Sequence, residues 1–198
     1  MHYVVADLHL DHFNVVLYEP VRAQKLAELM DISVEEVHRR IIDKDVDLLR
    51  VHNQMLIDIW NSVIQPEDVV FCLGDFSLTT NKAKLKNFIS QLNGHKRFIL
   101  GNHDRVKTSF YTESGCESAS RYPVLYNDHI FLSHEPLPHH LVPEGYINFF
   151  GHVHGNLHFN WERGKCVSIE QLEGFRPVAI DEFIKPWHEH NPDRHQEK

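Results

Sequence analysis

The stretch Arg97-Phe98-Ile99-Leu100-Gly101-Asn102-His103-Asp104 joins a short apolar run to a polar loop. Runs of β-branched and aromatic residues such as Arg97–Leu100 predict buried β-strands. The strand ends at a glycine, and an amide, an imidazole and a carboxylate follow it directly. One loop therefore presents three functional groups at the end of a predicted strand.

The same arrangement occurs five times along the chain. The predicted strands and the polar groups after them are His2–Ala6 with Asp7-Leu8-His9, Val69–Leu73 with Gly74-Asp75, Arg97–Leu100 with Gly101-Asn102-His103-Asp104, Ile130–Ser133 with His134, and Ile147–Phe150 with Gly151-His152-Val153-His154. A single strand that ends in Gly-Asp is usually only a turn. In open α/β sheets, however, ligands bind beyond the carboxyl ends of strands. Five such endings in one chain therefore predict one shared site.

Helical patterns alternate with these strands, so the sequence predicts an α/β fold. Apolar residues at helical spacing predict a helix over Lys82–Leu92, with Gly94 as its carboxyl-terminal cap. Ser33, with Glu36 three residues later, forms a capping box that opens a broken helical stripe ending before Pro66. Two further strands are expected at Cys166–Ile169 and Val178–Ile180.

Length and composition indicate one globular domain. The chain has 198 residues, of which 42% are hydrophobic and 24% charged, and a domain averages about 150 residues. We expect a domain over residues 1–186 with a helical elaboration at about 19–63, and a polar tail over 187–198. No apolar run approaches the roughly 20 residues of a membrane span. The first residues lack a signal-peptide pattern, and the three cysteines form no disulfide or zinc pattern. A cytoplasmic protein is expected.

Charge and histidine content narrow the functional classes. The chain has 20 basic and 28 acidic residues, a net charge of −8. This balance argues against a protein that binds long nucleic acid by neutralising many phosphates, but it permits a small phosphorylated ligand held by a metal. The 17 histidines are numerous enough to call for a chemical explanation.

The candidate ligands combine imidazole, carboxylate and amide oxygen, which suit Mn, Fe, Ni or Zn ions. Thiolates are absent from the set, so a structural zinc site is not expected. The seven candidates are too many for one ion and suit two ions that share a carboxylate. Two metals about 3.5–4 Å apart are an arrangement suited to phosphoryl transfer. The candidates are Asp7, His9, Asp75, Asn102, His134, His152 and His154.

These blocks, in this order, resemble the five signature blocks of the calcineurin-like metallophosphoesterases. The flanking stretches Asp7-Leu8-His9-Leu10-Asp11-His12-Phe13-Asn14 and Leu92-Asn93-Gly94-His95-Lys96 are similar to those of the small single-domain prokaryotic and phage members. The resemblance spans residues 2 to about 180. It implies an αββα sandwich of two mixed β-sheets flanked by helices, with a dinuclear metal site at the carboxyl-terminal ends of the strands.

The resemblance also implies roles for individual residues. One metal would be held by Asp7, His9, Asp75 and His154, and the other by Asp75, Asn102, His134 and His152. A metal-bridging hydroxide would attack in line, and His103 would stand by the leaving group, oriented by Asp104. The chain departs from the family pattern in the charged helical stretch Glu19–Val63 and near Ser168-Ile169-Glu170. Both departures concern the substrate and not the metal chemistry.

Three residues near the blocks have less specific signals. His12 could contact substrate or support the metal ligands, or only shape its loop. Arg105 could contact a phosphate, although an arginine after such a loop is more often solvated. Asn14 is expected to cap a helix.

Two other classes can be weighed against this hypothesis. The HxHxDH box of metallo-β-lactamase-like hydrolases resembles Asp7–His12, but the first His is missing and Gly-Asn-His-Asp has no place in that scheme. Partner-binding proteins on the phosphoesterase fold lose the His after the metal-binding Asn, whereas this chain keeps His103.

The sequence therefore predicts a metal-dependent phosphoric ester hydrolase that acts on small, nucleotide-like phosphodiesters or phosphomonoesters, with two divalent ions, Mn²⁺ first. A nuclease and a protein phosphatase on the same fold remain alternatives. The physiological substrate, the native metal and the oligomeric state are left open.

Overall fold

The strands of the protein form two sheets in the computed structural model, which describes residues 1–189. The first sheet has five strands in the order β4-β3-β2-β1-β9, and the second has four in the order β5-β6-β7-β8. Their bounds are β1 His2–Val5, β2 Val69–Cys72, β3 His95–Ile99, β4 Ser118–Ser120, β5 Val124–Tyr126, β6 Ile130–Ser133, β7 Ile147–Phe150, β8 Gly164–Cys166 and β9 Val178–Ala179.

Both sheets are mixed. β1 to β4 run parallel to their neighbours, and β9 pairs antiparallel with β1. In the second sheet β6, β7 and β8 are parallel and β5 is antiparallel to β6. Parallel strands are buried on both faces, which is why they read as continuous apolar runs. The predicted α/β fold with two mixed sheets flanked by helices is confirmed.

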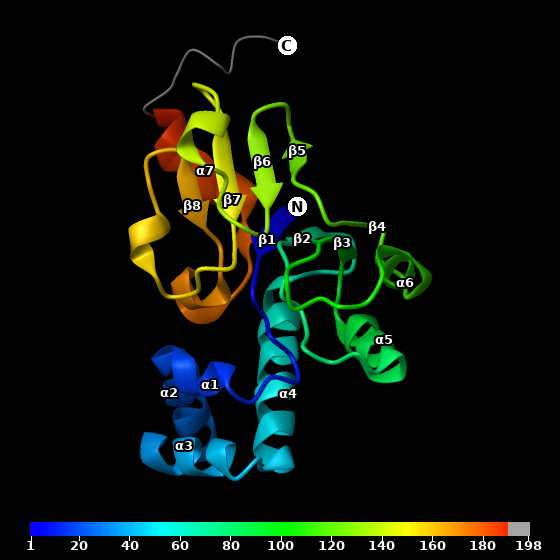
Figure 1. Cartoon of the computed structure of the whole chain (residues 1–198), viewed down its shortest axis with the longest axis vertical. Helices are drawn as coiled ribbons and strands as arrows, with labels where there is room; N and C mark the ends of the chain where they lie inside the picture. The colour runs from blue at the N-terminus through cyan, green and yellow to red at the C-terminus, as the bar shows by residue number, and fades with distance from the viewer. Residues whose placement is uncertain (190–198) are drawn as a thin grey trace.

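Helices surround the sheets and fill the lower part of the molecule in Figure 1, where α1 to α4 lie beneath the strands. The helices are α1 Val15–Tyr18, α2 Pro20–Met30, α3 Val34–Ile42, α4 Val46–Val63, α5 Lys82–Gln91, α6 Thr108–Glu113 and α7 Ile180–Glu189. Short 3₁₀ turns occur at His139–Leu141, Leu157–Phe159, Ile169–Gln171 and Glu173–Phe175. Within residues 1–189, no helix has the length and hydropathy that a membrane crossing needs.

Helices α2 to α4 occupy the stretch 19–63, where the helical elaboration is expected. The Ser33 side chain caps α3 by accepting from the Glu36 backbone N–H at 3.2 Å, as the capping box predicts. The helical stripe is broken because Lys44 adopts a left-handed φ of 58° and Asp45 caps a new helix. Trp60 of α4 is fully buried, and its indole donates to the Asn93 carbonyl oxygen at 3.0 Å.

Several local expectations differ from the structure. The strands β4 and β5 are not predicted from the sequence, because they are three-residue strands of mostly exposed or half-buried residues. The strand expected at Cys166–Ile169 is Gly164–Cys166. After Cys166 the chain leaves this strand, and Val167 and Ile169 form backbone hydrogen bonds with Ala6.

Two helix ends also differ from the expectation. Gly94 does not cap α5; the helix ends at Gln91 with Leu92 as its cap, and Gly94 turns the chain toward β3. α7 runs to Glu189, so the expected tail is helical over 187–189, and the rest of it, 190–198, lies outside the described residues.

The carboxyl ends of strands from both sheets meet at one place. A side chain at Gly151, after β7, would place its Cβ 2.6 Å from Asp7 Oδ2. A Cβ at Gly101, after β3, would lie 2.2 Å from Asp75 Oδ1 and 2.8 Å from Cε1 of His134, which follows β6 of the other sheet. Contacts this short cannot be relieved by small shifts. Glycine at both positions therefore lets the strand ends of the two sheets converge.

Candidate metal centre

The backbone at the strand ends is unusual. Five of the predicted ligands have left-handed φ values, 59° at Asp7, 51° at His9, 50° at Asp75, 71° at His152 and 49° at His154. Residues with a Cβ seldom adopt this region, and such strain is concentrated at functional sites. The left-handed residues let the side chains of Asp7 and His9 leave the pleat of β1. The two loops still bond each other, from Asp7 N to Gly74 O at 3.0 Å and from His9 N to Asp75 O at 2.9 Å.

A first cluster contains Asp7, His9 and His154, whose nearest donor atoms lie within 4.8 Å of one another. Asp7 is fully buried, and its Oδ2 accepts from Ser168 Oγ at 2.6 Å and from His152 N at 2.9 Å. Its Oδ1 is buried without a hydrogen-bond partner. Burial raises the pKa of this carboxyl group to about 8. A cation would satisfy both the charge and the unpartnered oxygen.

A second cluster contains Asp75, His134 and His152. Asn102 joins it, because its Oδ1 lies 3.0 Å from His134 Nε2 and 3.0 Å from His152 Nδ1. His134 Nδ1 lies 2.9 Å from the Leu73 carbonyl oxygen and must donate to it, since a carbonyl only accepts. In the neutral ring, Nε2 then carries a lone pair that faces other acceptors. A divalent cation accounts for this group of acceptors.

Asp75 lies between the two clusters. Its Oδ1 is 3.5 Å from His134 Nε2, and its Oδ2 is 3.4 Å from His9 Nε2. The His103 backbone N–H donates to Oδ1 at 2.9 Å and fixes the carboxylate. Each oxygen of one carboxylate therefore faces a different cluster.

The pKa shifts of two candidate imidazole ligands, His9 and His134, suit metal binding. Burial and the nearby Arg22 charge hold the pKa of His9 well below its usual range, and burial lowers the pKa of His134. Neutral imidazole is the form that binds metal. For His154, burial lowers the pKa, but the hydrogen bond to Glu170 and the Asp7 carboxylate outweigh it and raise the pKa to about 9. The donor set and the unpartnered buried atoms fit two divalent ions.

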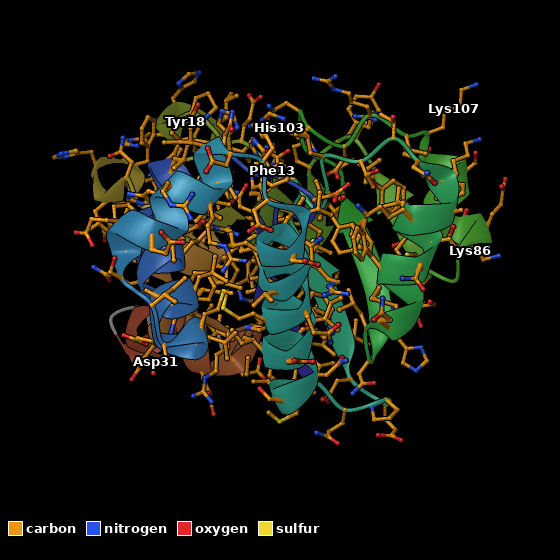
Figure 2. All side chains as sticks on the ribbon, turned by 90° about the horizontal axis from the view of Figure 1, so that it is seen from below. Phe13, Tyr18, Asp31, Lys86, His103 and Lys107 are labelled. Atoms are coloured by element: carbon orange, nitrogen blue, oxygen red, sulfur yellow. The ribbon has the colours of Figure 1, made fainter. Side chains whose placement is uncertain are left out.

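His103 lies beside both clusters. Its side chain is 34% exposed, its Nε2 is 3.9 Å from Asp75 Oδ2, and its ring centroid is 5.2 Å from that of His9. In Figure 2, seen from below, His103 lies above α4, between the side that carries Tyr18 and the side that carries Lys107. The His103 side chain is therefore partly accessible to solvent beside both clusters.

The prediction that Asp104 orients His103 is wrong. Asp104 is buried, and its Oδ1 accepts from the Phe76 and Ser77 backbone N–H groups and from the Tyr111 hydroxyl. Its Oδ2 accepts from Gly101 N at 2.9 Å. His103 Nδ1 has no hydrogen-bond partner. The loop sends adjacent side chains to opposite sides, so Asp104 stabilises the strand-end loops.

The other three residues singled out in the sequence, His12, Arg105 and Asn14, make different contacts. His12 Nδ1 lies 3.0 Å from His9 Nδ1, so one of the two rings donates to the other and His12 supports a candidate ligand. Arg105 is exposed to solvent, and a phosphate contact there stays a prediction. Asn14 stands at the N-cap of α1 without a capping bond, because its Oδ1 accepts from Lys44 Nζ at 3.0 Å.

Three residues that surround His154 were not predicted as site residues from the sequence. Glu170 and Ser168 lie in the stretch that was expected to concern only the substrate, but both contact the first cluster. Arg22 is a fully buried arginine of α2 that bonds Glu170. Arg22 lies four residues before the buried Leu26, on the apolar face of that helix. This spacing was the one sign in the sequence that Arg22 is buried.

The fold and the site thus define an α/β protein with two buried His/Asp clusters at the ends of its strands. No protein-family model matches the chain. Uncharacterized protein MJ1445 of Methanocaldococcus jannaschii is 28% identical over 195 residues, which cover 92% of this chain and 89% of that protein.

Two phage proteins and one solved structure are also similar. The gene 66 proteins of mycobacterium phages L5 and D29 are 37% identical over 71 residues and 45% identical over 56 residues. These matches span about a third of each phage protein, 34% and 28%. The crystal structure of AQ665, a protein of unknown function from Aquifex aeolicus, has a TM-score of 0.61 at 21% identity and covers 94% of this chain and 98% of that one. The comparisons show that the chain has homologues and shares its fold with a solved structure. None of these proteins is described by an activity.

Proposed function

We propose that the protein is a dinuclear-metal-dependent phosphoesterase that hydrolyses small, nucleotide-like phosphodiesters and phosphomonoesters. The observation that carries this proposal is the position of Asp75, whose two oxygens face His9 of one cluster and His134 of the other. A shared carboxylate holds two cations close together. Two adjacent cations suit the attacking and leaving oxygens of a phosphoryl transfer.

The residues of the chain position the metal ligands and supply a proton for the leaving oxygen. Bound divalent ions would supply Lewis acidity and an activated water. Asp75 holds the loop of His103 by accepting from its backbone N–H, and His12 supports His9 through the bond between their Nδ1 atoms. Asn102 Oδ1 would bind the ion of the second cluster together with His134 and His152. His103 is accessible beside Asp75 and is the candidate donor of a proton from Nε2 to the leaving oxygen.

The surroundings of the second cluster support a small substrate. A cavity of about 380 Å³ is lined by Glu135, Pro136, His152, Val153, Asn156 and Phe159. A second cavity, of about 430 Å³, includes Asn102 and His134 in its lining. Sites for small ligands typically have volumes of about 300–1,000 Å³. The net charge of −8 disfavours long nucleic acid.

The test is hydrolysis by the full chain loaded with Mn²⁺. We expect cleavage of bis-p-nitrophenyl phosphate, and of some members of a panel of cyclic nucleotides, mononucleotides and dinucleotide polyphosphates. Asp75→Asn should abolish it, and Asp47→Asn, at an exposed position of α4, should not. Rapid cleavage of duplex DNA without cleavage of small diesters would favour a nuclease. Two bound ions without any hydrolysis would favour a partner-binding protein.

A further inference from the structure

Arg22 is a charged residue in the interior of the protein. It belongs to α2, in the helical elaboration, and its side chain has no exposed surface. Its Nε donates to Glu170 Oε1 at 2.6 Å, its Nη1 to Leu8 O at 2.9 Å, and its Nη2 to Asp7 O. A buried charge with this many partners is held in a single orientation.

Two partners of Arg22, the carbonyl oxygens of Asp7 and Leu8, lie in the turn that carries ligands of the first cluster. Asp7 is a candidate ligand, and Leu8 is the residue between the candidate ligands Asp7 and His9. The two carbonyl oxygens are those of the left-handed turn that directs both side chains inward. Arg22 therefore fixes the backbone of this turn from outside the cluster.

Glu170 connects Arg22 to the third member of the cluster. The same Oε1 that accepts from Arg22 Nε lies 3.3 Å from His154 Nδ1, and the Glu170 side chain is 1% exposed. A donor bond from Nδ1 to a carboxylate leaves Nε2 of His154 as the atom free to bind a cation. Glu170 also balances the Arg22 charge, which would otherwise repel a cation in the cluster.

Arg22 and Glu170 come from the two stretches in which the sequence departs from the metallophosphoesterases that it resembles. Arg22 lies in the stretch Glu19–Val63, and Glu170 lies in Ser168-Ile169-Glu170. They are 148 residues apart in the chain and meet beside His154. Each departure thus supplies one half of a single contact.

We propose that Arg22 and Glu170 are positioning residues that hold the turn at Asp7-Leu8 and the ring of His154 in the geometry for one of the two metal ions. The proposal rests on the proposed function, since it needs a metal in the first cluster. It assigns the helical elaboration a task at the metal centre. Outer residues that orient metal ligands typically contribute about 10–100-fold to metal affinity.

The experiment measures retained metal and not activity. Full-length protein loaded with Mn²⁺ is dialysed against increasing chelator, and bound Mn²⁺ per chain is counted. In the wild-type protein we expect two ions. In Glu170→Gln and Arg22→Met, one ion should leave at about 10–100-fold lower chelator concentration, while the ion of the Asp75, His134 and His152 cluster is retained longer. The matched control is Arg40→Gln, which breaks the Arg40–Asp45 ion pair of 2.6 Å in the same helical elaboration. It should release both ions as the wild type does.

A double variant separates positioning from folding. Breaking one half of a buried ion pair can prevent folding, whereas replacing both halves by apolar residues of similar size often preserves it. Arg22→Met combined with Glu170→Met should therefore remain folded and still lose one ion early. Retention of both ions by this variant at wild-type chelator concentrations would overturn the proposal and leave the proposed function intact. A wild-type protein that holds no Mn²⁺ would refute both.

Discussion

Asn102 Oδ1 lies 3.0 Å from His134 Nε2, although neither atom carries a hydrogen when His134 donates from Nδ1 to the Leu73 carbonyl oxygen. Two acceptors at this distance repel each other unless a cation or a proton lies between them. Burial lowers the pKa of His134, which disfavours a proton. With the Asn102 amide in this orientation, a cation bound by both atoms accounts for the contact.

The position of the Asp75 carboxylate between the two clusters predicts how many metal ions each variant binds. Asp75→Asn removes a charge that faces both clusters, so both ions should be lost and hydrolysis should fall to background. Asn102→Ala removes one oxygen from the second cluster alone, so one ion should remain. Elemental analysis of each purified variant gives the metal content. Wild-type metal content in Asp75→Asn would refute the bridging role.

Removing the candidate proton donor should produce a loss that depends on the leaving group. A general acid contributes about 10²–10⁴-fold when the leaving oxygen is a strong base. His103→Ala should thus strongly slow hydrolysis of an alkyl or nucleoside ester and affect a nitrophenyl ester much less, with two ions still bound. Rates on matched esters measure the ratio. Equal losses on both, together with a lower metal content, would show that His103 supports the site instead.

The hydrogen bonds of Asp104 predict a loss of stability. Asp104→Asn replaces one acceptor oxygen by a donor, which would leave at least one buried N–H or O–H group unsatisfied at a cost of about 1–3 kcal/mol. Tyr111→Phe, which removes only one of these bonds, should cost about 1 kcal/mol. Chemical denaturation gives both values. If Asp104→Asn kept wild-type stability and reproduced the leaving-group effect of His103→Ala, Asp104 would orient that imidazole after all.

His52 predicts a dependence of stability on pH. Burial and the adjacent Arg22 lower the pKa of this fully buried imidazole from 6.5 to about 3 in the folded protein. Between these values the unfolded chain binds the extra proton, so the free energy of unfolding decreases as pH falls below 6.5. The decrease is about 1.4 kcal/mol per pH unit at most.

The matched comparison is His52→Gln, which keeps an acceptor for Arg22 and does not titrate. Urea denaturation at pH 7.5 and 5.5 should show wild type losing about 1.4 kcal/mol more than the variant. Parallel losses in the two proteins would mean that His52 is accessible to protons in the fold.

The sequence by itself determined the strand endings and the residues that follow them. Apolar runs that stop at Gly101 or Gly151 and continue with Asn, His or Asp are local patterns, and local patterns predict local structure well. The capping box at Ser33 is of the same kind, and the structure has that bond. Short strands such as Ser118–Ser120 leave no apolar period to detect.

Only the tertiary structure decided how these groups face one another. Which side of a loop a side chain leaves depends on φ, and the left-handed values at Asp7, His9 and Asp75 are stabilised by contacts between different strand ends. For the same reason Asp104 turns away from the adjacent His103. The contact of Arg22 with Glu170 joins residues 148 positions apart, and the packing of α2 against the segment after β8 brings them together. No local propensity records a contact of that kind, because its free energy comes from the packing of segments that are distant in sequence.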